Sequence, residues 1–192
     1  MQLLIQYSRK TVQTQSIGVS TMNHSNNIVP LEMTLCPGCQ ALLPVQNLPT
    51  NPRYHASSEC WASFGELSAY NIEHAEPTFL HQLAVDAYGA QHAGGQSRPI
   101  TTTFSLIGMY LVHEKGFTGR QVQLAHMQLA KHKFSWITFD PPDQTGTLTV
   151  VDVLQAEAGA ARDQQIREWS ASVWESWSAF HGWTAEFCQK HL

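Results

Sequence analysis

The chain has 192 residues, 43% of them hydrophobic, which is enough for one domain with a packed core. Its formal net charge is -4 and its 11 lysines and arginines are scattered, so nonspecific nucleic-acid binding is not expected. The sequence contains neither a run of roughly 20 apolar residues nor a secretory signal at its start, so we expect a cytoplasmic protein that does not span a membrane.

The N-terminal region differs in composition from the rest of the chain. Residues 1–31 contain no Asp or Glu and are rich in Gln, Ser, Thr and Asn. Such a stretch buries too little apolar surface to offset the entropy lost on ordering. We therefore predict a flexible tail over residues 1–32 and a single folded domain over residues 33–192.

A Cys-x-x-Cys motif, Cys36-Pro37-Gly38-Cys39, begins the predicted domain, and Cys60 follows about twenty residues later. Pro and Gly between two cysteines favour a tight turn that directs both sulfur atoms to one point, as a tetrahedral zinc ion requires. Four cysteines in a chain of this length do not indicate a disulfide framework. The motif therefore predicts a zinc knuckle.

Helical periodicity follows this knuckle, after an irregular, proline-rich stretch over residues 35–56. We find no convincing alternation with a period of two and predict no strands. The predicted helices cover about residues 59–71, 77–92, 102–115 and 118–133, a short segment after Thr149, and residues 160–188 with a break near Gly182. The expected fold is thus mostly α, a single-domain bundle of about five to six helices with an N-terminal zinc knuckle.

Several residues indicate where these helices begin and which of them form the core. Ser57 or Ser58 is a suitable N-cap for the first helix, Thr118 for the fourth and Thr149 for the fifth. Pro77 is suited to the first turn of the second helix. The third helix is apolar on nearly all sides, which is typical of a helix at the centre of a core. In the last helix, the core stripe consists of Trp169, Val173, Trp177 and Phe180.

Helix geometry indicates which histidine could be the fourth metal ligand. If the first two helices form an antiparallel hairpin, each about 14 residues or roughly 20 Å long, His92 returns to the level of Cys60. His81 is then left about 16 Å away along the second helix. His55, five residues before Cys60, is the alternative ligand. The predicted metal site consists of Cys36, Cys39, Cys60 and His92.

Other interpretations of the cysteines and polar residues stay open. The three cysteines could pack as small hydrophobic residues without a metal, or form a redox pair, although no strand–helix context for a redox motif is visible. Cys188 is expected to be a free thiol. His81, Asp86 and Tyr88 could line a pocket between the second and the last helix together with His181, but hydrogen bonds between packed helices explain such polar residues more simply.

Several short motifs together resemble a bacterial protein family of unknown function, DUF5946. They span about residues 35–183 and occur in the same order as in the family. The motifs are Cys36-Pro37-Gly38-Cys39, Cys60-Trp61, Gly65-Glu66-Leu67, Val85-Asp86-Ala87-Tyr88, Gln91-His92, Leu148-Thr149-Val150, Asp152-Val153-Leu154, Val173-Trp174-Glu175 and Trp177-Ser178.

This resemblance bears on the choice of ligand. It implies that the position of His55 is usually apolar and that His81 has a matching histidine, which favours His92 over His55 and leaves a role for His81. Ser105 stands where such proteins often have a histidine in the third helix, so a site that relies on that histidine is in doubt. The resemblance implies no known activity.

Two classes of function remain. The first is a small cytoplasmic protein in which a closed Cys3His zinc site is structural and the helical body binds a protein or a small molecule. The second is an enzyme that uses the polar residues between the second and last helices, or a zinc ion with a water as its fourth ligand. A protein side chain in the fourth position favours the first class, and a water favours the second.

Overall fold

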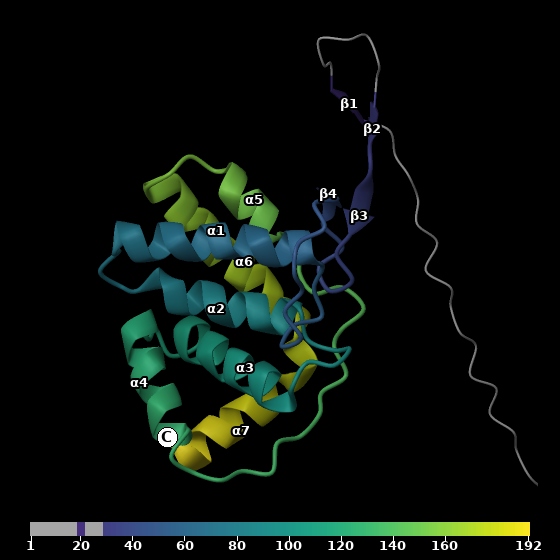
Figure 1. Cartoon of the computed structure of the whole chain (residues 1–192). Coiled ribbons are helices and arrows are strands. Elements are labelled where there is room, and N and C mark those ends of the chain that lie inside the picture. Colours follow the sequence, from purple (N-terminus) through teal and green to yellow (C-terminus); the bar gives the residue numbers. More distant parts are fainter. Residues whose placement is uncertain (1–18, 22–28) are drawn as a thin grey trace, which may run out of the picture.

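The computed structural model describes residues 19–21 and 29–192 of the chain. Helices make up most of this part, as the sequence predicts (Figure 1). They are α1 (Ser58–His74), α2 (Leu80–Gln91), α3 (Pro99–His113), α4 (Gly119–Leu129), α5 (Val150–Gln155), α6 (Ala160–Ser176) and α7 (His181–His191). None of the described helices combines the length and the apolar character that a membrane crossing requires.

The predicted starts of three helices are confirmed by their caps. The Ser57 hydroxyl accepts a hydrogen bond from the Cys60 backbone N–H at the start of α1. Thr118 caps α4 and Thr149 caps α5, each within a capping box that satisfies backbone N–H groups in the first turn. Asp152 supplies the carboxylate of the second box, in the first turn of α5.

The start of α2 differs from the prediction. The helix begins at Leu80, after Phe79 in the left-handed conformation (φ 62°, ψ 56°), so Pro77 lies in the preceding turn and not in the helix. The Glu76 carboxylate accepts hydrogen bonds from the backbone N–H groups of Thr78 and Leu80. An acidic side chain in the turn thus satisfies two backbone donors at the start of α2, and no sequence motif indicates this role.

The last predicted helix is divided into α6 and α7 by a 3-10 turn, Ser178–Phe180, several residues before the expected break at Gly182. The carbonyl oxygen of Trp174 accepts hydrogen bonds from the Trp177 N–H and from the His181 ring. These bonds replace the regular helical pattern and end α6 at Ser176. Gly182 lies inside α7.

Helix α2 occupies the centre of the bundle. It contacts α1, α3, α4 and α6, and it runs antiparallel to α1, so the predicted hairpin is present (Figure 1). Most residues of α3 are buried, as its apolar sequence predicts. Trp169, Val173 and Trp177 are fully buried, whereas Phe180 is only partly buried at the edge of the core.

Two short antiparallel strand pairs precede the helices and were not predicted. Strands β1 (Val19–Thr21) and β2 (Val29–Leu31) lie within the predicted tail, most of which (1–18 and 22–28) is outside the described residues. Strands β3 (Met33–Leu35) and β4 (Leu42–Pro44) pair with Leu35 opposite Leu42 and flank the Cys-x-x-Cys motif. Each strand has three residues, too few for an alternating pattern to be recognised in the sequence.

Candidate metal centre

The Cys-x-x-Cys motif forms the turn between β3 and β4. The Cys36 N–H donates to the Ala41 carbonyl at 2.9 Å, and the Gln40 N–H donates to the Cys36 carbonyl at 2.9 Å. Gln40 has a positive φ of 62°, which lets the chain turn back directly after Cys39. The backbone of the turn therefore brings both cysteine sulfur atoms to the same side, facing the helices.

Cys60 is held by the first turn of α1. Its backbone N–H is fixed by the cap Ser57 at 3.2 Å, and its side chain is fully buried. Its sulfur atom lies 3.7 Å from the sulfur of Cys39. The first turn of α1 thus places a third sulfur against the knuckle.

His92 follows the last residue of α2, and its side chain is fully buried. Its Nδ1 lies 2.9 Å from the Tyr88 carbonyl oxygen, which can only accept a hydrogen bond. Nδ1 must therefore carry the proton, and the lone pair of neutral His92 is on Nε2. That atom lies 3.3 Å from the Cys60 sulfur, so the free lone pair faces the cysteines.

The geometry of the four side chains fits a tetrahedral ion. Their ligand atoms all lie within 4.8 Å of one another. Typical Zn–S and Zn–N bond lengths imply S···S separations of about 3.8 Å and S···N separations of about 3.6 Å in a tetrahedral site. The observed values of 3.7 Å and 3.3 Å are close to these. The arrangement, which comprises Cys36, Cys39, Cys60 and His92, could therefore hold a metal ion.

The electrostatics of the thiols fit the same role. Hydrogen bonds from Cys39 and Cys60 lower the pKa of Cys36, so one thiol readily ionises. The hydrogen bond between Cys39 and Cys36 raises the pKa of Cys39 to about 12. Hydrogen bonds of Cys60 with Cys36 and Cys39 likewise raise the pKa of Cys60. These interactions favour ionisation of Cys36 over that of Cys39 and Cys60, and binding of a cation would release the protons of the remaining thiols.

A dense shell of side chains supports His92 and the knuckle. The Tyr88 ring stacks between Phe64 at 4.1 Å and His92 at 4.0 Å, measured between ring centroids. A Cβ atom at Gly38 would lie 2.7 Å from the His92 ring and 2.5 Å from the His55 carbonyl oxygen, so only glycine allows the knuckle to approach this closely.

Contacts from the long loop between α4 and α5 complete this shell. The Thr145 hydroxyl donates to the Gly38 carbonyl at 3.1 Å. The Gln91 amide donates to the carbonyls of Thr145 and Leu148 and accepts from the indole of Trp169. Thr145 was missed in the sequence because it lies 107 residues from Gly38 and belongs to no motif. The one sequence feature connected with this contact is the Gln91-His92 pair, because Gln91 bonds to the Thr145 carbonyl.

The alternative ligands lie outside the cluster. The His55 backbone N–H donates to the His92 carbonyl at 2.8 Å, while its ring packs against Gly95. His81 is half-buried near the start of α2, and burial lowers its pKa. The structure therefore brings together the four predicted residues and neither alternative histidine, although the assignment of all four as ligands stays a prediction.

The four residues of the alternative catalytic pocket contact different neighbours. Asp86 is fully buried against Gly108 of α3 and accepts a hydrogen bond from Gln82. The Tyr88 hydroxyl lies 3.8 Å from the Cys60 sulfur. The His181 ring stacks on Trp174 with 3.7 Å between the ring centroids, and its Nε2 lies 2.9 Å from the backbone carbonyl oxygen of Trp174. These contacts favour the interpretation as helix packing.

Comparison with known proteins identifies the family. The sequence model of a family of unknown function, DUF5946, matches residues 34–178, about three quarters of the chain. The chain therefore belongs to this family, and the matched region contains all four residues of the candidate metal centre. No curated protein and no solved structure matches the chain.

Proposed function

We propose that this member of the DUF5946 family holds a zinc ion with the three cysteines and His92, and that the site is structural. The position of His92 carries the proposal: its Nδ1–H is engaged by a backbone carbonyl and its Nε2 lies 3.3 Å from the Cys60 sulfur. A histidine in this state is ready to act as a metal ligand. The cluster then has four protein ligands and no position for a substrate or water.

The choice of zinc rests on ligand chemistry. Three thiol sulfur atoms and one imidazole nitrogen at tetrahedral separations are typical of structural zinc sites. Cys36, Cys60 and His92 are fully buried, which suits a site that is closed to solvent. Bound zinc would neutralise the thiolates and join their chain segments. We place the protein in the cytoplasm because a reducing compartment preserves free thiols for metal binding.

Such a site would join three separate parts of the chain. The β3–β4 turn provides Cys36 and Cys39, the start of α1 provides Cys60, and the end of α2 provides His92. Without this connection, the short two-stranded turn would have few contacts of its own to fix it on the bundle. We propose that the helical body, fixed in this way, serves as a binding or scaffold protein for another protein or a small molecule.

The test is the metal content of purified protein, measured for the wild type, His92→Ala and His55→Ala. We expect one zinc per chain in the wild type and in His55→Ala, because the His55 ring lies outside the cluster. We expect zinc to be lost or weakly bound in His92→Ala. Equal zinc binding by the two variants would overturn the assignment of His92 as a ligand. A wild type that contains no metal even after refolding in the presence of zinc would overturn the metal site itself.

A further inference from the structure

A cavity of about 330 Å³ lies at the end of the α1–α2 hairpin opposite the metal centre. Its volume is at the lower end of the range of small-molecule sites. The last turn of α1, the α1–α2 turn and the start of α4 provide its walls. The lining residues are Asn71, Ile72, Ala75, Glu76, Pro77, Phe79 and Arg120.

Asn71 is the buried polar group of this cavity. The residue is 8% exposed, and its Nδ2 atom has no hydrogen-bond partner among the described residues. A buried amide nitrogen without a partner loses its hydrogen bonds to water on folding and gains none in return, which destabilises the folded state. Rotation of the amide about its terminal bond exchanges oxygen and nitrogen, so either atom can face a ligand. A ligand that accepts a hydrogen bond would satisfy this group.

Arg120 provides a positive charge at the same cavity. Its guanidinium lies 4.1 Å from the centre of the Phe79 ring, and its Nη1 donates to Gln123 at 2.7 Å. Contact with the ring restricts the guanidinium on one side, and its other N–H groups have no partner in the part of the chain that the structure describes. A planar guanidinium held in this way is suited to two parallel hydrogen bonds with a carboxylate.

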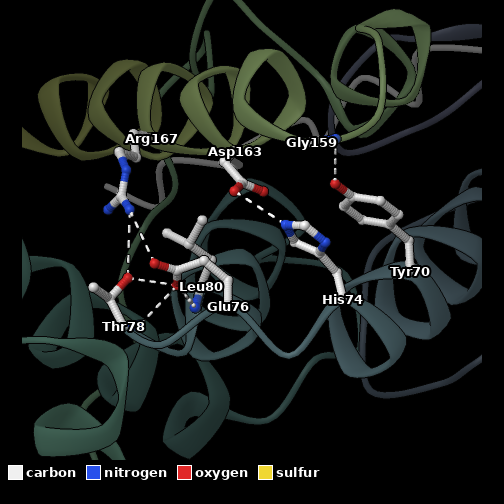
Figure 2. A network of polar contacts seen from close by, with 8 residues as sticks. All are labelled: Tyr70, His74, Glu76, Thr78, Leu80, Gly159, Asp163 and Arg167. Atoms are coloured by element: carbon white, nitrogen blue, oxygen red, sulfur yellow. Dashed lines mark hydrogen bonds and ion pairs between the residues drawn. The ribbon is translucent and has the colours of Figure 1, made fainter.

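Glu76 also lines the cavity, but its charge is compensated within the protein. Figure 2 shows its carboxylate facing the α2 N-terminus and Arg167 of α6. It accepts hydrogen bonds from the backbone and hydroxyl of Thr78 and from the backbone of Leu80. Burial would raise the pKa of Glu76, but these bonds outweigh it and lower the pKa. The carboxylate is thus ionised and paired, and Arg120 stays available for another anion.

The remaining wall is apolar. Ile72, which is 65% exposed, lines the cavity together with the apolar side chains of Phe79 and Pro77. Phe79 has a positive φ of 62°, a conformation that is costly for a bulky residue and that places its ring beneath Arg120. An exposed apolar surface next to an available guanidinium matches a ligand with one apolar and one anionic part.

We propose that this cavity binds a small organic carboxylate with an aromatic or branched apolar body. The carboxylate would contact Arg120 and the Asn71 amide, and the body would cover Ile72, Phe79 and Pro77. The site lies at the end of the hairpin away from the cysteines, so the proposal does not depend on metal binding.

Titration of the ¹⁵N-labelled full chain with phenylacetate tests this proposal by NMR. We expect saturable shifts of the Asn71 side-chain amide and the Ile72 backbone amide below about 5 mM. Phenylacetamide, which has the same body without the charge, should bind at least about tenfold more weakly. Arg120→Gln should weaken phenylacetate binding by a similar factor, whereas Arg98→Gln, which changes an exposed arginine elsewhere, should not.

Three outcomes would overturn the proposal. The first is the absence of saturable shifts at Asn71 and Ile72 in the wild type. The second is equal binding of phenylacetate and phenylacetamide, which would show that the carboxylate is not recognised. The third is an unchanged affinity for phenylacetate in an Arg120→Gln variant whose NMR spectrum shows that it is folded like the wild type. Binding of phenylacetate by Ile72→Ser with unchanged affinity would overturn the assignment of the apolar wall.

Discussion

The two ends of the α1–α2 hairpin are fastened by different chemistry. At one end, the start of α1 and the end of α2 meet in a cluster of three cysteines and His92. At the other end, Glu76 in the turn accepts hydrogen bonds from the start of α2 and lies 3.7 Å from Arg167 of α6 (Figure 2). In our proposal, the first end would need a cation to balance its sulfur atoms, whereas the second has both charges within the chain.

This difference predicts that the two ends respond separately to loss of metal. The sulfur end loses its connection when the ion is removed, because thiols that keep their protons attract one another only weakly. The carboxylate end keeps its hydrogen bonds and its ion pair.

Cys60→Ser should have the largest effect. Loss of a structural metal ligand is expected to lower the free energy of unfolding by more than about 3 kcal/mol in the presence of zinc. Cys188→Ser is the matched control, because Cys188 is buried and free, and it should cost about 1–2 kcal/mol. Urea unfolding measures both values.

Hydrogen exchange of the Cys60→Ser protein then locates the damage. Protection should fall in the β3–β4 turn and at the end of α2, while the amides of Thr78 and Leu80 stay protected by Glu76. Equal loss of protection at both ends of the hairpin would contradict the separation.

Asp86, in α2 between the two ends, should make stability depend on pH. Burial raises the pKa of Asp86 well above its ordinary value, with a smaller opposing effect of the Gln82 hydrogen bond. The folded state therefore keeps a proton that the unfolded state releases, and stability falls as pH rises from about 4 toward the folded pKa. The slope reaches at most about 1.4 kcal/mol per pH unit.

Asp86→Asn should remove this slope and make the protein more stable than the wild type at pH 8. The measurement is urea unfolding from pH 5 to pH 8, with both proteins in the same buffers. Parallel stability curves for the two proteins would show that folding does not raise the pKa of Asp86.

Glu76→Ala should have a smaller effect at the carboxylate end. It removes the hydrogen bonds to the start of α2 and is expected to cost about 1–2 kcal/mol, as the loss of a helix cap does. Arg167→Gln should cost less than about 1 kcal/mol, because the Arg167 side chain is 43% exposed and its pair with Glu76 is long. Thermal unfolding compares the two, and a larger loss for Arg167→Gln would show that the ion pair dominates.

The sequence was most informative at the sulfur end of the hairpin. Cys36 and Cys39 form a recognisable local motif. The predicted antiparallel hairpin was enough to place His92 beside Cys60, although α1 has 17 residues and α2 has 12 instead of about 14 each. The caps Ser57, Thr118 and Thr149 were found because capping acts within about one turn of the helix. In each case the interacting residues are close in sequence or related by regular geometry.

The carboxylate end could not be predicted for the opposite reason. Arg167 lies 89 residues from Thr78, its hydrogen-bond partner at 3.4 Å, and neither belongs to a pattern. The start of α2 was misplaced at Pro77 because the left-handed Phe79 leaves no trace in composition or periodicity. The division between α6 and α7 depends on the His181 side chain, which competes for a backbone carbonyl only once the bundle is packed.

The most direct test of the account is X-ray absorption at the zinc edge of purified, zinc-loaded protein. We predict a first shell of three sulfur atoms at about 2.3 Å and one imidazole nitrogen at about 2.0 Å, with the nitrogen lost in His92→Ala. A wild-type shell with an oxygen in place of the nitrogen would contradict a closed structural site. It would identify an open position of the kind that catalytic zinc sites have.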